Sequence, residues 1–312
     1  MKVLKHLRIL IIISLVPILM AHLISCNPRQ EPKKITLEEA LVLEAEEELP
    51  EKNPVRIAIG SMITPREGYA YYKQLLNYIG EKLGRPVKFI EREKYAEINA
   101  LLKTGYLDVA FICSKPYVDG HKEFGLKLLV IPQINGKTEY YSYIIVPVDS
   151  PVKTFEELQG KTFAFTDPDS NTGKLVPTYM LFKINETPDS FFKEYIFTND
   201  HDKSIKAVAR KIVDGAAVDS LIWDYYNKFN PELTTKTRII LKSPPYGIQP
   251  VVVPPGIDPE IKNKLRKIFL DIHKDEKGKK ILEGMMIDRF VAGDDASYNS
   301  IRGMIALMEQ RK

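Results

Sequence analysis

The chain has 312 residues, of which 44% are hydrophobic and 28% charged, with an ordinary content of glycine and proline. This composition excludes a disordered, collagen-like or multi-span membrane protein, and the length predicts one large or two moderate domains. The formal charge of +4 includes Lys2, Lys5 and Arg8, so the rest of the chain is nearly neutral and does not predict a nucleic-acid-binding surface.

The first 25 residues have the pattern of a secretory signal peptide. The three basic residues precede an apolar stretch, 9–21, that is too short to span the ~30 Å hydrocarbon core of a bilayer comfortably. It ends in Leu23-Ile24-Ser25-Cys26, which resembles a bacterial lipobox and implies a lipid on Cys26. We therefore expect an exported protein that is lipid-anchored to a membrane on the periplasmic or extracellular side. A plain membrane anchor with an incidental cysteine is the alternative.

The second cysteine of the chain is Cys113. With Cys26 lipidated it has no partner, which excludes a disulfide framework and any CxxC redox or zinc site. A lone thiol can act as a nucleophile. Because Cys113 directly follows the apolar run 107–112, we expect it instead to be buried as a small hydrophobic side chain.

Strands and helices alternate regularly after a polar tether, residues 26–53. Strands are predicted at 55–60, 86–90 and 107–112, helices at 68–84 and 95–103, and further β-rich stretches at 126–132 and 139–147. A second series has strands 162–165, 195–198 and 216–219 and helices 172–184, 202–213 and 220–229. Strands 238–241 and 249–253 and helices 259–273, 278–285 and 295–310 follow. Nearly continuous apolar strands between helices are typical of parallel sheets covered on both faces.

Two extended, proline-flanked segments near 143–148 and 247–254 bracket the middle of the chain. The sequence therefore predicts an α/β protein with two lobes joined by two crossing strands. We assign residues 54–145 and 250–312 to the first lobe and residues 146–249 to the second. Such a hinge lets the lobes close around a ligand held in the cleft between them.

Polar residues follow the carboxyl ends of the predicted strands, where open α/β sheets bind their ligands. They are Ser61, Ser114, the segment Ser170-Asn171-Thr172-Gly173, His201 and Asp219. The hydroxyl and amide groups of the segment lie at the start of a helix, whose free N–H groups and dipole favour an anion. Residues of these types are also ordinary helix N-caps. Asp219 is open to three interpretations: a general base, an N-cap or the partner of a bound cation.

Motifs for catalysis, metals and cofactors are missing from the sequence. Gly173-Lys174 is not a P-loop, because Pro168 stands where the earlier glycine is required and Leu175 where Ser or Thr must follow. The sequence has no HExxH, GxSxG or paired His/Cys cluster. We therefore expect a protein that is not an enzyme and uses no cofactor or metal, which disfavours an exported hydrolase.

The same residues resemble the PhnD-like family of phosphonate- and phosphite-binding proteins of ABC importers, over about residues 55–308. The family stretch Asp-Pro-x-Ser-x-Ser/Thr-Gly-x-Leu-Val-Pro appears here as Asp167-Pro168-Asp169-Ser170-Asn171-Thr172-Gly173-Lys174-Leu175-Val176-Pro177. Further matches are at 105–110, 140–142, 146–151, 207–209 and 214–220, with His201 before the helix that contains 207–209.

The resemblance implies a type II periplasmic-binding-protein fold that closes on a phosphorus oxyanion and passes it to a membrane permease. Ser170, Asn171, Thr172, Tyr140 and His201 fall on oxyanion-contacting positions, and Asp219 lies near an acid that binds a ligand amino group in some members. The chain departs from the family at Ile112, where a tyrosine is expected, and at Gln249, where an acid is expected. Both departures disfavour an aminoalkylphosphonate, so phosphate, phosphite or an anion without phosphorus is as well supported.

The function expected from these patterns is a lipid-anchored, monomeric substrate-binding protein of an ABC importer. Its partners are a small oxyanion, the permease in the inner membrane and the membrane itself through Cys26. An extracytoplasmic sensing module for a membrane receptor or histidine kinase is the alternative, because it needs the same hinge and cleft.

Overall fold

A computed structural model describes residues 54–60 and 69–310. The predicted signal peptide, Cys26, the tether and Ser61 lie outside these residues. Among the helices described, none has the length and apolar character needed to cross a membrane.

Strands from both ends of the described chain form a first sheet, in the order β13-β4-β12-β3-β1-β2. Its strands are β1 (Val55–Ile59), β2 (Val87–Ile90), β3 (Val109–Phe111), β4 (Lys127–Gln133), β12 (Val251–Val253) and β13 (Arg289–Val291). Strand β1 is parallel to β2 and β3, whereas β12 is antiparallel to β3 and β4. The sheet begun by the first strands is thus completed by the last part of the chain.

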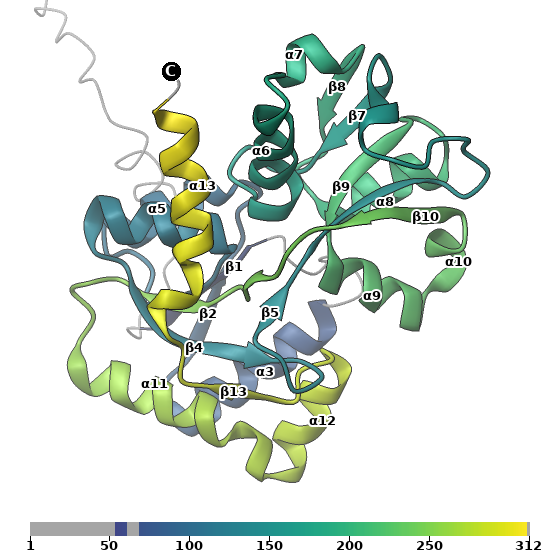
Figure 1. Cartoon of the computed structure of the whole chain (residues 1–312). Helices are drawn as coiled ribbons and strands as arrows, with labels where there is room; N and C mark the ends of the chain where they lie inside the picture. Colours follow the sequence, from purple (N-terminus) through teal and green to yellow (C-terminus); the bar gives the residue numbers. More distant parts are fainter. Residues whose placement is uncertain (1–53, 61–68, 311–312) are drawn as a thin grey trace, which may run out of the picture. The chain divides into compact units, whose positions relative to one another are not determined.

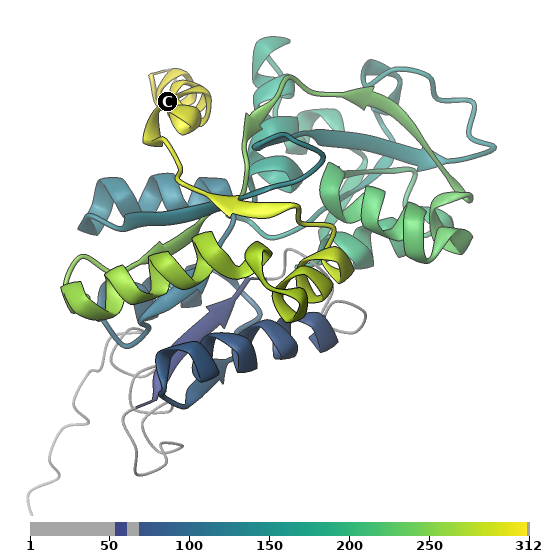
Figure 2. The ribbon, with the colours of Figure 1, turned by 90° about the horizontal axis from the view of Figure 1, so that it is seen from below.

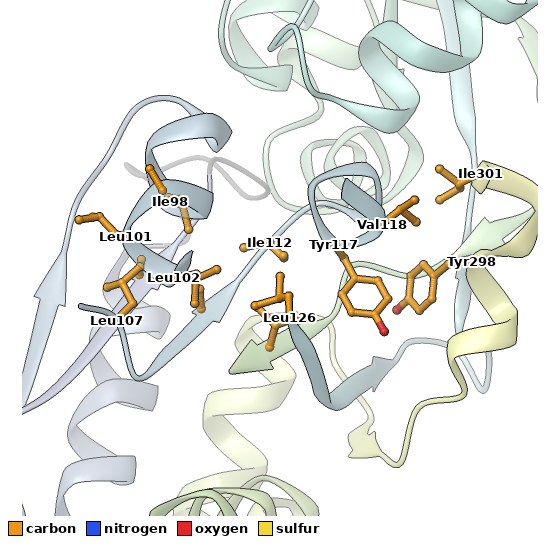
Figure 3. Packing of buried hydrophobic residues seen from close by; sticks show 14 of the residues in the cluster. Ile98, Leu101, Leu102, Leu107, Ile112, Tyr117, Val118, Leu126, Tyr298 and Ile301 are labelled. Carbon is orange, nitrogen blue, oxygen red and sulfur yellow. The ribbon is translucent and has the colours of Figure 1, made fainter. Parts of the chain in front are cut away.

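Helices cover both faces of the first sheet. They are α3 (Tyr69–Leu83), α11 (Pro259–Asp271) and α12 (Glu276–Gly284) on one face and α4 (Tyr95–Lys103), α5 (Ser114–Phe124) and α13 (Asn299–Glu309) on the other. Because successive strand residues point to opposite faces, Phe111 packs with α3 and α11 while Ala110 packs with α4 and α5. Figure 2 shows α3 and α11 side by side, and Figure 3 shows Ile98, Tyr117 and Ile301 in the opposite layer.

A second sheet has the order β10-β6-β9-β7-β8. Its strands are β6 (Ser142–Pro147), β7 (Thr162–Phe165), β8 (Glu194–Phe197), β9 (Gly215–Asp219) and β10 (Thr237–Lys242). The surrounding helices are α6 (Val176–Lys183), α7 (Pro188–Phe191), α8 (His201–Ala209), α9 (Ser220–Phe229) and α10 (Pro231–Thr234). Helices α8 and α9 cover one face and α6 the other. On α9, the indole N–H of Trp223 donates to Thr237 Oγ1 at 3.1 Å, which ties the helix to β10.

Two chain segments connect the sheets and pair with each other. Strand β5 (Glu139–Tyr140) is antiparallel to β11 (Tyr246–Gly247), with Tyr140 opposite Tyr246. Figure 1 labels β5 on the connection between the two sheets. We call the six-stranded sheet with its helices the first lobe and the five-stranded sheet with its helices the second lobe. The predicted fold class, two α/β lobes with a two-strand hinge, is confirmed.

Several local features differ from the predicted elements. Helix α5 and strand β13 were not predicted, and 3₁₀ turns lie at Glu156–Leu158, Ile272–Lys274 and Asp295–Tyr298. The predicted lobe boundary at residues 145 and 146 falls inside β6, all of which belongs to the second sheet. On the first crossing segment, the change of sheet therefore takes place between β5 and β6.

Candidate functional site

The predicted anion segment forms the entrance to α6. Residues Asn171–Leu175 make a wide π-helical turn that runs directly into the helix, and Ser170 Oγ accepts a hydrogen bond from the Gly173 N–H at 3.0 Å. We call Ser170–Gly173 the helix entrance. Ser170 is therefore the N-cap, which was one of its two interpretations; its contact with a ligand stays a prediction.

Gly173 lies where no side chain fits. A Cβ at this position would stand 1.8 Å from Thr166 Oγ1. The backbone of the helix entrance thus packs directly against the end of β7, with no space for a side chain between them. The glycine fixes the position of the helix against the sheet, which in turn positions Asn171 and Thr172.

Tyr140 and Asn171 meet where the first crossing segment passes the helix entrance. Asn171 Nδ2 donates to the Tyr140 hydroxyl at 3.0 Å, and the Asn171 N–H donates to Cys113 Sγ at 3.5 Å. Both Tyr140 and Cys113 are buried, as predicted for the thiol. Burial raises the pKa of Tyr140 well above its usual range and that of Cys113 to about 11, so both groups are uncharged at neutral pH.

His201 and Asp219 form a second pair at the end of β9. The Asp219 N–H donates to His201 Nδ1 at 3.0 Å, which leaves the imidazole proton on Nε2. Burial lowers the pKa of His201 to about 3, so the ring is neutral. One Asp219 carboxylate oxygen caps α9 by accepting from the Leu221 N–H at 2.8 Å, and the other accepts from Gln249 Nε2. The N-cap interpretation of Asp219 is confirmed.

Ser114 lies beside the first of these pairs, because it hydrogen-bonds with the Tyr140 side chain. Ser114 Oγ donates to the Gly247 carbonyl at 2.7 Å and ties the start of α5 to the second crossing segment. Its role as a ligand contact stays a prediction. Ser61 lies outside the described residues.

The lobes touch at the helix entrance, where an open cleft was expected. Asp167 Oδ2 accepts from the Tyr95 N–H at 3.2 Å, and Lys115 Nζ contacts Asp169 Oδ1 at 3.0 Å, each pair joining the two lobes. Ser170, Asn171 and Thr172 are fully buried. The cleft is thus closed at this place in the structure.

Two polar atoms of the helix entrance are nevertheless unsatisfied. Thr172 Oγ1 and Asn171 Oδ1 are buried and have no hydrogen-bond partner among the described residues. An unsatisfied buried polar group costs about 1–3 kcal/mol, so a further molecule that hydrogen-bonds to these two neighbouring atoms would recover that cost.

Tyr95 and Gln249 are neighbours of this site that were not among the polar residues identified after the predicted strands. Burial raises the pKa of Tyr95 well above its usual range, and Cys113, Asp167, Asp200 and Asp219 raise it further by the negative charges they carry once ionised. These groups come from both lobes, so the Tyr95 ring lies among them. Tyr95 is the first residue of α4, the helix that follows β2. Its position after a strand could have identified it from the sequence.

Comparison with known proteins gives consistent matches. The family described as periplasmic substrate-binding proteins of phosphonate ABC transporters matches residues 57–298. The phosphonates-binding periplasmic protein of Escherichia coli K12 is 28% identical over 236 residues, 74% of this chain and 70% of that one. A binding-protein component of an ABC phosphonate transporter from Pseudomonas aeruginosa superposes with a TM-score of 0.78 at 26% identity, covering 84% of this chain and 88% of that one. The PhnD1 protein of Prochlorococcus marinus in complex with methylphosphonate superposes with a TM-score of 0.74 at 19% identity. The match covers 82% of this chain and 98% of that one.

Proposed function

This chain belongs to the family of periplasmic substrate-binding proteins of phosphonate ABC transporters, and from that membership we propose that it captures a small phosphorus oxyanion at the helix entrance. The family consists of binding components of transporters and not of enzymes, which agrees with the missing catalytic motifs. The ligand class proposed is phosphonate, phosphite or phosphate.

The observation that carries this proposal is the pair of unsatisfied atoms on Asn171 and Thr172. The Thr172 hydroxyl can donate to an oxyanion that lies at the positive end of the α6 dipole. The amide of Asn171 serves equally well when its oxygen and nitrogen exchange places, since the two atoms have nearly the same size and the side chain keeps its shape. Tyr140 then donates to the amide oxygen and Nδ2 faces the anion.

The donors of the proposed site are all uncharged. His201 is neutral and presents Nε2–H, because its Nδ1 is occupied by the Asp219 N–H. Thr172 and Asn171 add a hydroxyl and an amide. Fixed neutral donors in a water-free site bind an anion strongly, because their dipoles are already oriented before the ligand arrives.

We further propose that the mature chain is monomeric and starts at a lipidated Cys26, with residues 26–53 as a tether that lets it reach the permease. Stable attachment to a membrane generally needs two anchoring groups, and the two acyl chains of a diacylated cysteine supply both. Metabolic labelling with a fatty acid tests the anchor, and an unlabelled chain would contradict it.

The oxyanion site is tested by Thr172→Val, which keeps the shape of the side chain and removes its hydroxyl. Since Thr172 Oγ1 has no partner among the residues that the structure describes, the ligand-free variant should be as stable as the parent or slightly more stable. Binding of methylphosphonate should weaken by roughly 5- to 150-fold, the equivalent of about 1–3 kcal/mol for a hydrogen bond to a charged group. Isothermal titration and thermal melting measure the two effects.

Thr178→Val is the matched control. Thr178 lies on α6, which the helix entrance leads into, and its hydroxyl is also buried without a partner in the described part of the chain. Its replacement should leave binding unchanged. Equal affinity in the Thr172 variant and the parent protein, or equal losses in both variants, would place the oxyanion elsewhere.

A further inference from the structure

A cavity of about 60 Å³ lies between the lobes, apart from the closed helix entrance. Tyr72 of α3, Phe111 of β3 and Phe290 of β13 line it from the first lobe, and Leu221, Ile222 and Tyr225 of α9 line it from the second. Closure of the lobes therefore creates this space as well as the polar site.

The walls of the cavity are mostly apolar. The ring of Phe111 lies edge-on to those of Tyr72 and Phe290, at centroid distances of 5.8 and 6.4 Å. Tyr72, Phe111, Ile222 and Tyr225 are all buried. Apart from Asn135, Asp224 and Gln249 the lining is apolar, so the space offers an ordered water few polar partners and favours an apolar group.

Gln249 joins the cavity to the proposed oxyanion site. Its side chain is 4% exposed and lines the cavity, while its Nε2 donates to Asp219. Asp219 in turn holds His201 through its backbone N–H. Gln249 therefore links the cavity to Asp219 and His201 of the proposed site.

The carboxyl groups near the cavity are already engaged. Both oxygens of Asp219 accept hydrogen bonds from the protein. Asp224 also lines the cavity; burial raises its pKa, while the charge of Lys242 and a hydrogen bond with Tyr143 lower it. An ammonium group entering the cavity would lose its hydration without gaining a free carboxylate.

We propose that this cavity receives a short alkyl substituent of the ligand, so that the preferred substrate is an alkylphosphonate. The inference rests on the proposed oxyanion site and specifies its ligand. One water needs ~10–15 Å³ of such space, so the cavity accommodates a chain of about two to four carbon atoms. Phosphite and phosphate would leave it empty.

A ligand series tests the inference on the full chain. Phosphite and methyl-, ethyl-, propyl- and 2-aminoethylphosphonate are compared by isothermal titration. Affinity should rise about fourfold with each added methylene until the cavity is filled, as burial of a CH₂ group predicts. Propylphosphonate should bind at least about tenfold more tightly than 2-aminoethylphosphonate, which has nearly the same shape but carries a charge.

A filled cavity provides the matching variant. Ile134 lines the cavity and is partly exposed, so Ile134→Phe adds bulk there with little risk to folding. The Ile134→Phe variant should lose the rise in affinity with alkyl chain length. Its affinity for phosphite should stay within about twofold of the parent. Ile212→Phe makes the same change at a side chain that is 63% exposed and should keep the full series.

The outcomes separate the two proposals. If phosphite and methylphosphonate bind but affinity stays flat along the series, the alkyl pocket is wrong and the oxyanion site stands. Tighter binding of 2-aminoethylphosphonate than of propylphosphonate also overturns the alkyl pocket, in favour of a cationic substituent. If none of the compounds binds, both proposals fail.

Discussion

Asp219 combines three contacts at the end of β9. Its N–H orients His201, one carboxylate oxygen caps α9, and the other accepts from Gln249. Burial raises the pKa of this carboxyl from 3.8 to about 8. At neutral pH the group is therefore protonated, and the proposed site is spared a negative charge next to its ligand.

Above pH 8 the affinity of the parent protein for its ligand should fall, and Asp219→Asn should abolish this fall. At pH 9, one unit above the pKa, Asp219 stays protonated in about one-tenth of the parent molecules. The affinity of the parent for methylphosphonate should therefore fall about tenfold from its value at pH 7. The variant is neutral throughout, and the ligand's own titration is common to both proteins. Isothermal titration at several pH values measures the difference, and identical pH profiles would contradict it.

The same substitution should change how stability depends on pH. A raised pKa means that the folded state binds the proton more tightly than the unfolded chain between pH 4 and 8. The stabilisation is therefore complete below pH 4 and is lost as the pH rises to 8, by up to about 1.4 kcal/mol per pH unit. Thermal melts should show a flatter pH dependence in Asp219→Asn than in the parent.

At the scale of single elements, the helix entrance depends on one close contact. Gly173→Ala would drive its Cβ into Thr166, whose Cβ and Cγ2 lie at 2.8 Å from that position. The backbone must shift to relieve the clash, at a cost of about 1–3 kcal/mol or more. Urea unfolding should show a lower midpoint, and binding should weaken because Asn171 and Thr172 move with the turn.

Gly303→Ala provides the opposite case. Gly303 lies within α13, and a Cβ there meets no atom of the described residues within 4 Å. Alanine in a helix interior is favoured over glycine by about 0.5–1 kcal/mol, so this variant should be more stable than the parent. Equal effects of the two substitutions would contradict the packing described for Gly173.

Sequence patterns predicted the long amphipathic elements and missed those that depend on context. Helix α5 was missed because Pro116 and Gly120 are usually helix breakers. Pro116 lies in the first turn, where no intrahelical hydrogen bond is lost. Gly120 packs so closely that a Cβ would lie 2.9 Å from Leu126 Cδ2. Strand β13 has only three residues, too few for a period to be recognised.

The site was predictable where it follows strand ends. Asn171, Thr172, His201 and Asp219 were selected by that rule, and the hydrogen bonds of Asn171 and Asp219 place Tyr140 and His201 beside them. The pairing of Gln249 with Asp219 was not predictable, because it joins residues of different lobes. The apolar cavity is built from many separate elements, and its existence depends on how the lobes meet.

On the scale of the whole molecule, the loop before the helix entrance makes two of the polar contacts that hold the lobes together. Asp167 accepts from the Tyr95 N–H, and Asp169 pairs with Lys115. Burial lowers the pKa of Lys115, but the carboxylates of Asp119 and Asp169 more than compensate and raise it, so the ammonium stays charged. Both acids belong to the same loop that leads into the helix entrance, so lobe contact and ligand contact are coupled.

Lys115→Met should shift the protein toward an open arrangement. Loss of a partly exposed ion pair changes an equilibrium by up to about fivefold, since such pairs contribute about 0.2–1 kcal/mol. Affinity should fall by the same factor, because the ligand must then close a more open protein. Small-angle scattering should show a larger radius of gyration for the free variant.

Lys211→Met is the control, because Lys211 pairs with Asp149 at an exposed position within the second lobe. It should leave both the scattering profile and the affinity unchanged. A scattering profile of the Lys115 variant identical to that of the parent would show that this ion pair does not govern closure.

The position of the single tryptophan has a practical consequence. Trp223 lies on α9, the helix that also supplies Leu221, Ile222 and Tyr225 to the space between the lobes. Its indole is held in one orientation by Thr237 and lies edge-on to Tyr143. The emission of this one fluorophore therefore reports on the surroundings of α9 without any added dye, and ligand capture can be followed optically in the unmodified chain.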